Sequence, residues 1–282
     1  MRIQESVTHD RLSEMGFTKS TAATVRRWLD RPFGLIVVTG PTGCGKSTTL
    51  YSTLDAYDAD ARKVVTVESP IEYDLPGVNQ IVLTPATGLT WESAIRAQLQ
   101  QDPDVMLISE VVSPAVAESV VRVALAGHVV RVAFHAPTAE GVLRRLLASG
   151  VDRRLLTESR IAILAQRLVR RLCPDCRQPD PDPEFAGIPS PLPEGTLYKP
   201  SGCSTCHQTG YRGRIAVHET LEPTSGLLET LDSAEAESAD PDTRPPEGAP
   251  TRASAGLLAS ALERAAQGVT SLDEARRVID PA

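Results

Sequence analysis

Short apolar runs alternate with segments of helical periodicity between residues 11 and 172. The runs are rich in β-branched residues and predict buried strands at 34–39, 63–68, 104–109 and 129–134. Apolar residues at helical spacing predict helices at 11–30, 46–57, 91–101, 115–126, 139–149 and 155–172. Strands that alternate with helices indicate an α/β fold with a mostly parallel sheet.

The pattern changes after residue 172. Residues 178–200 are rich in proline and predict a loop. Residues 233–254 are acidic, rich in proline and poor in apolar side chains, so they predict a disordered insertion. Apolar periodicity on either side of this insertion predicts helices at 219–231, 257–266 and 272–279.

Charge and hydropathy narrow the class of protein. The 282 residues carry a formal net charge of -7, which argues against a nucleic-acid motor, so we expect no nucleic acid partner. No apolar stretch is long enough for a membrane-spanning helix. Residues 1–10 lack the apolar segment of a signal peptide, and the sequence therefore predicts a cytoplasmic protein.

A phosphate-binding motif lies between the first predicted strand and the next predicted helix. Residues 40–47 fit G-x-x-x-x-G-K-[ST], in which glycines allow successive backbone N–H groups to converge on phosphates. Lys46 is expected to neutralise the β- and γ-phosphates of ATP, and Ser47 to hold Mg²⁺. The residues predicted to contact the nucleotide here are Gly40, Pro41, Thr42, Gly43, Cys44, Gly45, Lys46, Ser47 and Thr48.

Four of the five cysteines form two C-x-x-C pairs, Cys173 with Cys176 and Cys203 with Cys206. Two such pairs can hold Zn²⁺ through four thiolates, and this closed ligand set is typical of a structural site. The metal would stabilise a proline-rich loop that has no core of its own. A redox role is the alternative, but neither pair begins a thioredoxin-like βαβ unit.

Several segments occur in the order found in one family. They include the phosphate motif, the segment 67–73 that matches an aspartate box, and further matches at 94–97, 101–105, 127–128, 134–135, 165–176, 209–214 and 267–272. Together they resemble the C-terminal motor domain of the type II secretion and type IV pilus assembly ATPases.

This resemblance implies a RecA-like P-loop domain that works as a hexameric ring. ATP hydrolysis in the family drives pilus or pseudopilus assembly through inner-membrane platform proteins, which implies a peripheral position at that membrane. The family also has a preceding domain that supplies arginines to a neighbouring nucleotide. We do not expect that domain here, because only residues 1–33 precede the first predicted strand.

The resemblance also assigns candidate catalytic residues. Glu110 follows the third predicted strand at the place of the family's catalytic glutamate, where a carboxylate can orient water. Glu68 ends the second strand and could reach the metal, while His135 follows the fourth strand and could sense the γ-phosphate. Arg96 could couple the nucleotide to the ring. The alternatives are an exposed loop glutamate, an ordinary strand-end carboxylate, a histidine bonded to a backbone carbonyl, and a surface ion pair.

Some positions depart from the family pattern. Ser69 replaces an aspartate, and residues 111–113 read Val-Val-Ser where the family has Ile-Arg-Asp. Ser109 replaces a glycine, and residues 136–137 read Ala-Pro in place of Thr-Asn. Phosphate binding depends on the backbone and Lys46 and is expected to persist. The alternative function is therefore a nucleotide-binding paralogue with impaired hydrolysis and a regulatory or structural role.

Three parts follow from these patterns. Residues 1–172 are predicted to form the RecA-like nucleotide-binding domain with a short N-terminal helix. Residues 173–218 are predicted to form a small zinc-binding tetracysteine subdomain. Residues 219–282 are predicted to form a C-terminal helical region that contains the insertion.

Overall fold

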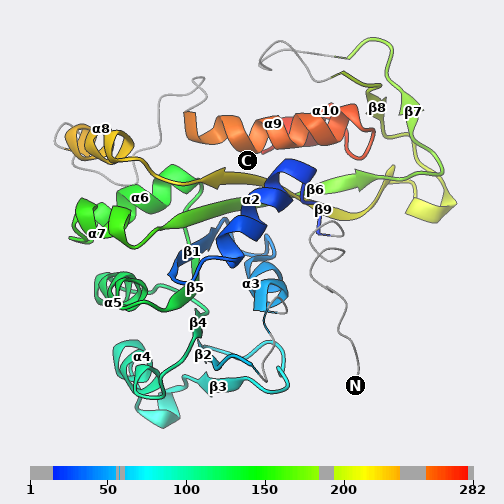
Figure 1. The fold of residues 1–282 in the computed structure, drawn as a ribbon. Coiled ribbons are helices and arrows are strands. Elements are labelled where there is room, and N and C mark those ends of the chain that lie inside the picture. The colour runs from blue at the N-terminus through cyan, green and yellow to red at the C-terminus, as the bar shows by residue number, and fades with distance from the viewer. Residues whose placement is uncertain (1–14, 55–56, 58–60, 184–193, 236–251, 279–282) are drawn as a thin grey trace.

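The computed structural model describes residues 15–54, 57, 61–183, 194–235 and 252–278. Their centre is a seven-stranded sheet of order β3-β2-β4-β5-β1-β6-β9 (Figure 1). The strands are β1 (Gly34–Thr39), β2 (Val64–Glu68), β3 (Asn79–Val82), β4 (Val105–Ile108), β5 (Val129–Phe134), β6 (Ala162–Leu172) and β9 (Tyr211–Leu221). All neighbours pair in parallel except β6 and β9, which confirms the predicted mostly parallel α/β fold.

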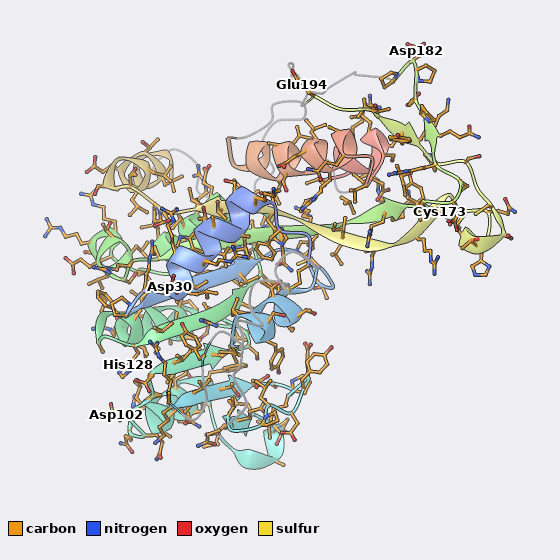
Figure 2. All side chains as sticks on the ribbon, turned by 45° about the vertical axis from the view of Figure 1, so that its right-hand side comes forward. Asp30, Asp102, His128, Cys173, Asp182 and Glu194 are labelled. Carbon is orange, nitrogen blue, oxygen red and sulfur yellow. The ribbon has the colours of Figure 1, made fainter. Side chains whose placement is uncertain are left out.

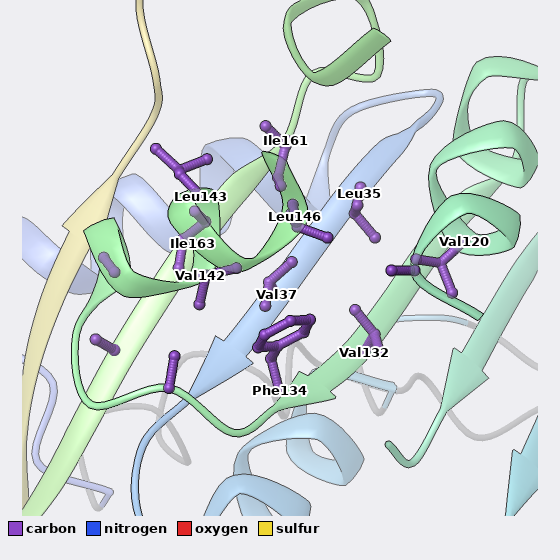
Figure 3. Close-up of a cluster of buried hydrophobic side chains, with 14 of the residues drawn as sticks. Leu35, Val37, Val120, Val132, Phe134, Val142, Leu143, Leu146, Ile161 and Ile163 are labelled. Carbon is purple, nitrogen blue, oxygen red and sulfur yellow. The ribbon is translucent and has the colours of Figure 1, made fainter. Parts of the chain in front are cut away.

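Helices cover both faces of the sheet. α2 (Lys19–Leu29) and α3 (Lys46–Leu54) pack on one face, against side chains such as Ile36 and Val38 of β1. The neighbouring Leu35 and Val37 point to the opposite face, because successive side chains of a strand alternate (Figure 3). The helices on that second face are α4 (Trp91–Leu99), α5 (Pro114–Leu125), α6 (Ala139–Ala148), α7 (Arg153–Glu158), α8 (Ser225–Glu235), α9 (Arg252–Ala266) and α10 (Leu272–Arg276).

Side-chain caps define where several helices begin. Thr18, Ser113 and Thr138 accept a hydrogen bond from a backbone N–H in the first turn of α2, α5 and α6 respectively. Pro114 follows the Ser113 cap, at a position where a missing N–H removes no helical hydrogen bond. None of the helices in the described residues is long and apolar enough to cross a membrane.

The helix predicted at 155–172 is wrong. The chain forms the short helix α7 and then the long strand β6, which pairs with β1 on one side and β9 on the other. Ala, Leu, Gln and Arg dominate this segment and favour a helix in isolation. Pairing with β1 and β9 overrides that preference, because residues 162–166 are buried in the sheet between the two strands.

Other predicted boundaries also change. Residues 219–221 of the helix predicted at 219–231 belong to β9, and α8 begins only at residue 225. Of the predicted disordered insertion, 233–235 and 252–254 are helical, while 236–251 lie outside the described residues. Short elements were not predicted: β3, β7 (Gln178–Pro179), β8 (Tyr198–Lys199) and the 3₁₀ turns η1 (Pro85–Thr87) and η2 (Ser204–Cys206). The division of the chain at 172 and 218 stays a prediction, and β9 continues across position 218.

A buried carboxylate holds the C-terminal helix α10 against β6. Glu274 is 2% exposed and accepts hydrogen bonds from the backbone N, Nε and Nη2 of Arg170, at 2.9, 2.9 and 2.6 Å. Arg277 Nη1 donates to the same carboxylate at 2.8 Å. Burial alone would raise the pKa of Glu274, but the hydrogen bonds from Arg170 and Arg277 outweigh it and lower the pKa.

Replacing Glu274 with alanine should lower the free energy of unfolding by about 2–3 kcal/mol, because Arg170 loses its buried partner. Since folding lowers the pKa of Glu274, its contribution is present above the unfolded value near 4.5 and is lost as the pH falls through the folded value. Urea unfolding at several pH values measures both effects. The matched control is Asp273→Ala, since that side chain is 77% exposed. Equal losses of unfolding free energy in the two variants would contradict a stabilising role for the hydrogen bonds to Glu274.

Candidate functional site

The phosphate motif lies where parallel strands end at one edge of the sheet. It connects β1 to α3, and its glycines adopt φ angles of 147° at Gly40, 75° at Gly43 and 90° at Gly45. A side chain is strained at such angles, so the glycines of the motif are required by the backbone. At Gly40 a Cβ atom would also lie 2.3 Å from the backbone oxygen of Gln166 on β6.

Three predicted site residues meet above this loop. Lys46 Nζ donates to the carbonyl oxygens of Gly40 and Pro41, at 2.9 and 3.0 Å, and lies 3.5 Å from Nδ1 of His135. His135 Nε2 lies 3.0 Å from Glu110 Oε1. A histidine protonated at Nε2 can accept from the lysine and donate to the glutamate at the same time. The ends of β4 and β5 thus bring Glu110 and His135 into one chain of contacts with Lys46, the first residue of α3.

A second carboxylate lies at the predicted magnesium site. Ser47 Oγ donates to Glu72 Oε1 at 2.7 Å, although Ser47 lies in α3 and Glu72 lies in the loop between β2 and β3. Hydroxyl and carboxylate oxygens are ligands that Mg²⁺ accepts. Glu72 was not among the predicted site residues. Its place in the aspartate-box segment 67–73 is a signal that could identify Glu72 as a site residue. Sequence reasoning favours Glu68 in that segment, because Glu68 ends a strand.

Glu68 itself is buried behind this position. It is 1% exposed, and its carboxylate accepts hydrogen bonds from Thr66 Oγ1 at 2.6 Å, from Gln80 Nε2 at 3.0 Å and from the Tyr51 hydroxyl. Burial and the hydrogen bond to Glu68 raise the pKa of Tyr51 to about 12. The same hydroxyl accepts from the backbone N of Glu72 at 3.3 Å. Glu68 is therefore connected to Glu72 through Tyr51.

The replaced family positions make structural hydrogen bonds. Ser109 Oγ accepts from the backbone N of Ser69 at 3.3 Å, and Ser69 Oγ donates to the Leu83 carbonyl at 3.0 Å. Ser113 caps α5, which is a role that aspartate also performs well. Val112 is 50% exposed. Ser69, Ser109 and Ser113 therefore support the local backbone through their side-chain hydrogen bonds.

Two other residues considered from the sequence lie apart from the phosphate motif. Arg96 is exposed on α4, and within the described part of the chain no contact joins it to the motif. His128 precedes β5 at the opposite edge of the sheet, and its Nδ1 lies 2.7 Å from the carbonyl oxygen of Pro103 (Figure 2). Cys44 faces inward within the motif, and burial raises the pKa of its thiol.

The four cysteines of the paired motifs form one cluster at the far end of the β6–β9 ribbon (Figure 2). Their sulfur atoms all lie within 4.8 Å of one another, with separations of 3.9, 3.8 and 3.7 Å for Cys173–Cys203, Cys176–Cys206 and Cys203–Cys206. Tetrahedral Zn²⁺ with bonds of about 2.3 Å requires sulfur separations of about 3.8 Å. The cluster fits a closed, structural zinc site.

Backbone amides favour thiolate at Cys206, whereas burial raises the pKa of Cys173 and raises that of Cys176 to about 12. Cys206 Sγ accepts from the backbone N of Cys203 and of Gly210, each at 3.2 Å, and Cys176 Sγ accepts from Gly202 at 3.3 Å. Burial alone would raise the pKa of Cys206, but hydrogen bonds from the two amides and from the Cys203 and Cys176 side chains outweigh it and lower the pKa to about 6. Thiolate is the form that binds zinc.

Known proteins resemble this chain in sequence. Type II secretion system protein E of Aeromonas hydrophila is 37% identical over 274 residues, which are 95% of this chain and 53% of that protein. The type IV pilus assembly ATPase PilB of Myxococcus xanthus is 36% identical over 226 residues, which are 78% of this chain and 40% of PilB. The chain thus spans about half the length of the curated relatives it matches.

Solved structures share the fold. The pilus retraction motor PilT with bound ADP has a TM-score of 0.64 and 23% identity, covering 95% of this chain and 66% of PilT. The ATPase DotB of Legionella pneumophila has a TM-score of 0.64 and 19% identity, covering 96% of this chain and 65% of DotB. The model of the family described as "Type II/IV secretion system protein" matches residues 1–277. The chain therefore belongs to the type II/IV secretion system protein family.

Proposed function

We propose that this chain is the motor part of an ATPase that hydrolyses ATP to ADP and phosphate to drive protein secretion or pilus assembly. The observation that carries the proposal is the convergence of Lys46, His135 and Glu110 on a glycine loop of phosphate-binding shape. The relatives named as type II secretion and type IV pilus ATPases supply the process.

Each residue has a distinct task in this proposal. Lys46 leaves the carbonyl oxygens of its own loop and neutralises the β- and γ-phosphates. Ser47 and Glu72 would hold Mg²⁺ and its water shell, and the ion would supply charge neutralisation at the phosphates. Glu110 orients the attacking water, and His135 holds Glu110 in place while contacting Lys46.

The assembly is also part of the proposal. A hexameric ring, bound peripherally at the inner membrane through platform proteins, is expected from the family resemblance. Arg96 is assigned to coupling between subunits, because its exposed position on α4 leaves it available to a neighbour. The alternative, a paralogue with impaired hydrolysis, rests on Ser69, Val112 and Ser113. It is less well supported, because Glu72 and Glu110 both remain beside the phosphate motif.

Substitution of Lys46 by alanine or of Glu110 by glutamine should reduce phosphate release at least about a hundredfold, because the transition state loses charge neutralisation or an oriented water. Phosphate release by the purified protein measures this. Glu118→Gln is the matched control, because it removes an exposed carboxylate that pairs only within α5 among the described residues. Turnover that both site variants retain would end the motor proposal, and negligible turnover of the unmodified hexamer would favour the paralogue.

The two carboxylates of the aspartate-box segment should respond differently to substitution. Glu72→Gln is expected to lower kcat at least about tenfold and to raise the Mg²⁺ concentration needed for half-maximal rate, with little change in stability. Glu68→Gln should mainly lower the urea midpoint, because Glu68 accepts three hydrogen bonds in a buried position. Magnesium titrations of ATPase rate, with urea unfolding alongside, separate them. An unchanged magnesium dependence in Glu72→Gln would rule out its assigned task.

The protein should contain about one zinc per chain, held by the four clustered cysteines. Cys206→Ser is expected to lose zinc and to lower the melting temperature, because the metal ties residues that share no apolar core. Cys44→Ser tests the loss of a cysteine outside the cluster and should keep the metal. Elemental analysis with thermal unfolding checks both. Full retention of zinc by Cys206→Ser would contradict the assignment.

A further inference from the structure

We propose that Gln166 is a positioning residue that fixes the peptide between Cys44 and Gly45 in the orientation needed to bind phosphate. The proposal rests on the proposed function, since it concerns nucleotide affinity. Gln166 lies on β6 directly after Ala165, which pairs with the last residue of β1. It is 1% exposed, so its amide group must find its partners inside the protein.

The amide nitrogen of Gln166 binds the phosphate motif, and the amide oxygen binds the helix that follows the motif. Gln166 Nε2 donates to the backbone oxygen of Cys44 at 2.7 Å. Gln166 Oε1 accepts from Thr49 Oγ1, in the second turn of α3, at 2.8 Å. A backbone carbonyl can only accept, so the NH₂ group has to face Cys44 and the orientation of the amide is settled.

The hydrogen bond to Cys44 determines where the next N–H points. In a planar trans peptide the carbonyl oxygen and the following N–H point in opposite directions. Because Gln166 holds the Cys44 oxygen toward β6, the Gly45 N–H is directed away from β6, into the interior of the loop. Without that hydrogen bond the peptide can rotate and present an oxygen atom to the phosphates, which repels their charge.

Close packing shows that the loop is shaped around Gln166. At Gly45 the constraint is the backbone angle φ of 90°, since a Cβ atom there would lie at an ordinary contact distance of 3.4 Å from Gln166 Nε2. At the start of the motif, a Cβ atom on Gly40 would lie 2.3 Å from the Gln166 backbone oxygen. One residue of β6 therefore contacts the beginning of the loop, its end, and α3 behind it.

Two single-atom changes separate positioning from general support of the fold. Gln166→Glu keeps an acceptor for Thr49 but places an oxygen where the N–H faces the Cys44 oxygen, and the two oxygens repel each other once the carboxylate is ionised. Thr49→Val removes the other hydrogen bond and leaves the bond to Cys44 intact. Gln166→Met removes both hydrogen bonds without adding a charge.

The experiment measures the Kd of a fluorescent ATP analogue with Mg²⁺, the urea midpoint, and KM and kcat for ATP. All three variants should lower the urea midpoint, because each leaves a buried polar group without a partner. Only Gln166→Glu and Gln166→Met should raise Kd and KM, by about tenfold or more, with kcat at saturation within about threefold. Thr49→Val should keep Kd within about threefold of the unmodified protein.

Two results would overturn the proposal. One is a Kd for Gln166→Met within about threefold of the unmodified protein, and the other is a Kd for Thr49→Val that rises as much as that of Gln166→Met. If the buried charge prevents Gln166→Glu from folding, the comparison of Gln166→Met with Thr49→Val decides. Failure of the unmodified protein to bind the analogue is a different outcome, which removes the proposed function and this proposal together.

Discussion

The phosphate site depends on keeping a glycine loop in one conformation at the end of a strand. Gly40, Gly43 and Gly45 give the loop its left-handed turns, but glycine also leaves a chain free to adopt other shapes. The structure restricts that freedom from both sides. Thr39 Oγ1 accepts from the Ala136 backbone N at 3.0 Å on the β5 side, and Gln166 holds the loop on the β6 side.

The order of the strands explains why residues from β5 and β6 lie beside the glycine loop. β1 lies between β5 and β6, and all three are parallel, so their carboxyl ends meet at one edge. β6 then continues past this edge to Leu172, directly before the first cysteine of the cluster. Glu274 fixes that extension to α10 through Arg170. The phosphate motif, the cysteine cluster and the C-terminal helices are thus joined by one strand (Figure 1).

Local chemistry was predictable from the sequence, and tertiary pairing was not. The glycine motif and the four cysteines are local patterns with a direct physical meaning, and the family resemblance adds the strand-end residues Glu110 and His135. The structure brings the members of each group together. The segment 162–172 could not be recognised as a strand, because its Ala, Leu, Gln and Arg residues favour helix until β9 pairs with it. Glu72 and Gln166 were missed for a related reason. Their partners, Ser47 and Cys44, are distant in sequence, and only the fold places them in contact.

The central claim is that this loop of backbone amides, together with Lys46, binds the triphosphate of a nucleotide. Calorimetric titration with a non-hydrolysable ATP analogue and Mg²⁺ tests it most directly, since it requires neither turnover nor a partner protein. We predict saturable binding at about one site per chain that becomes at least about tenfold weaker in Lys46→Ala. Absence of saturable binding, or equal affinity in the two proteins, would contradict the account.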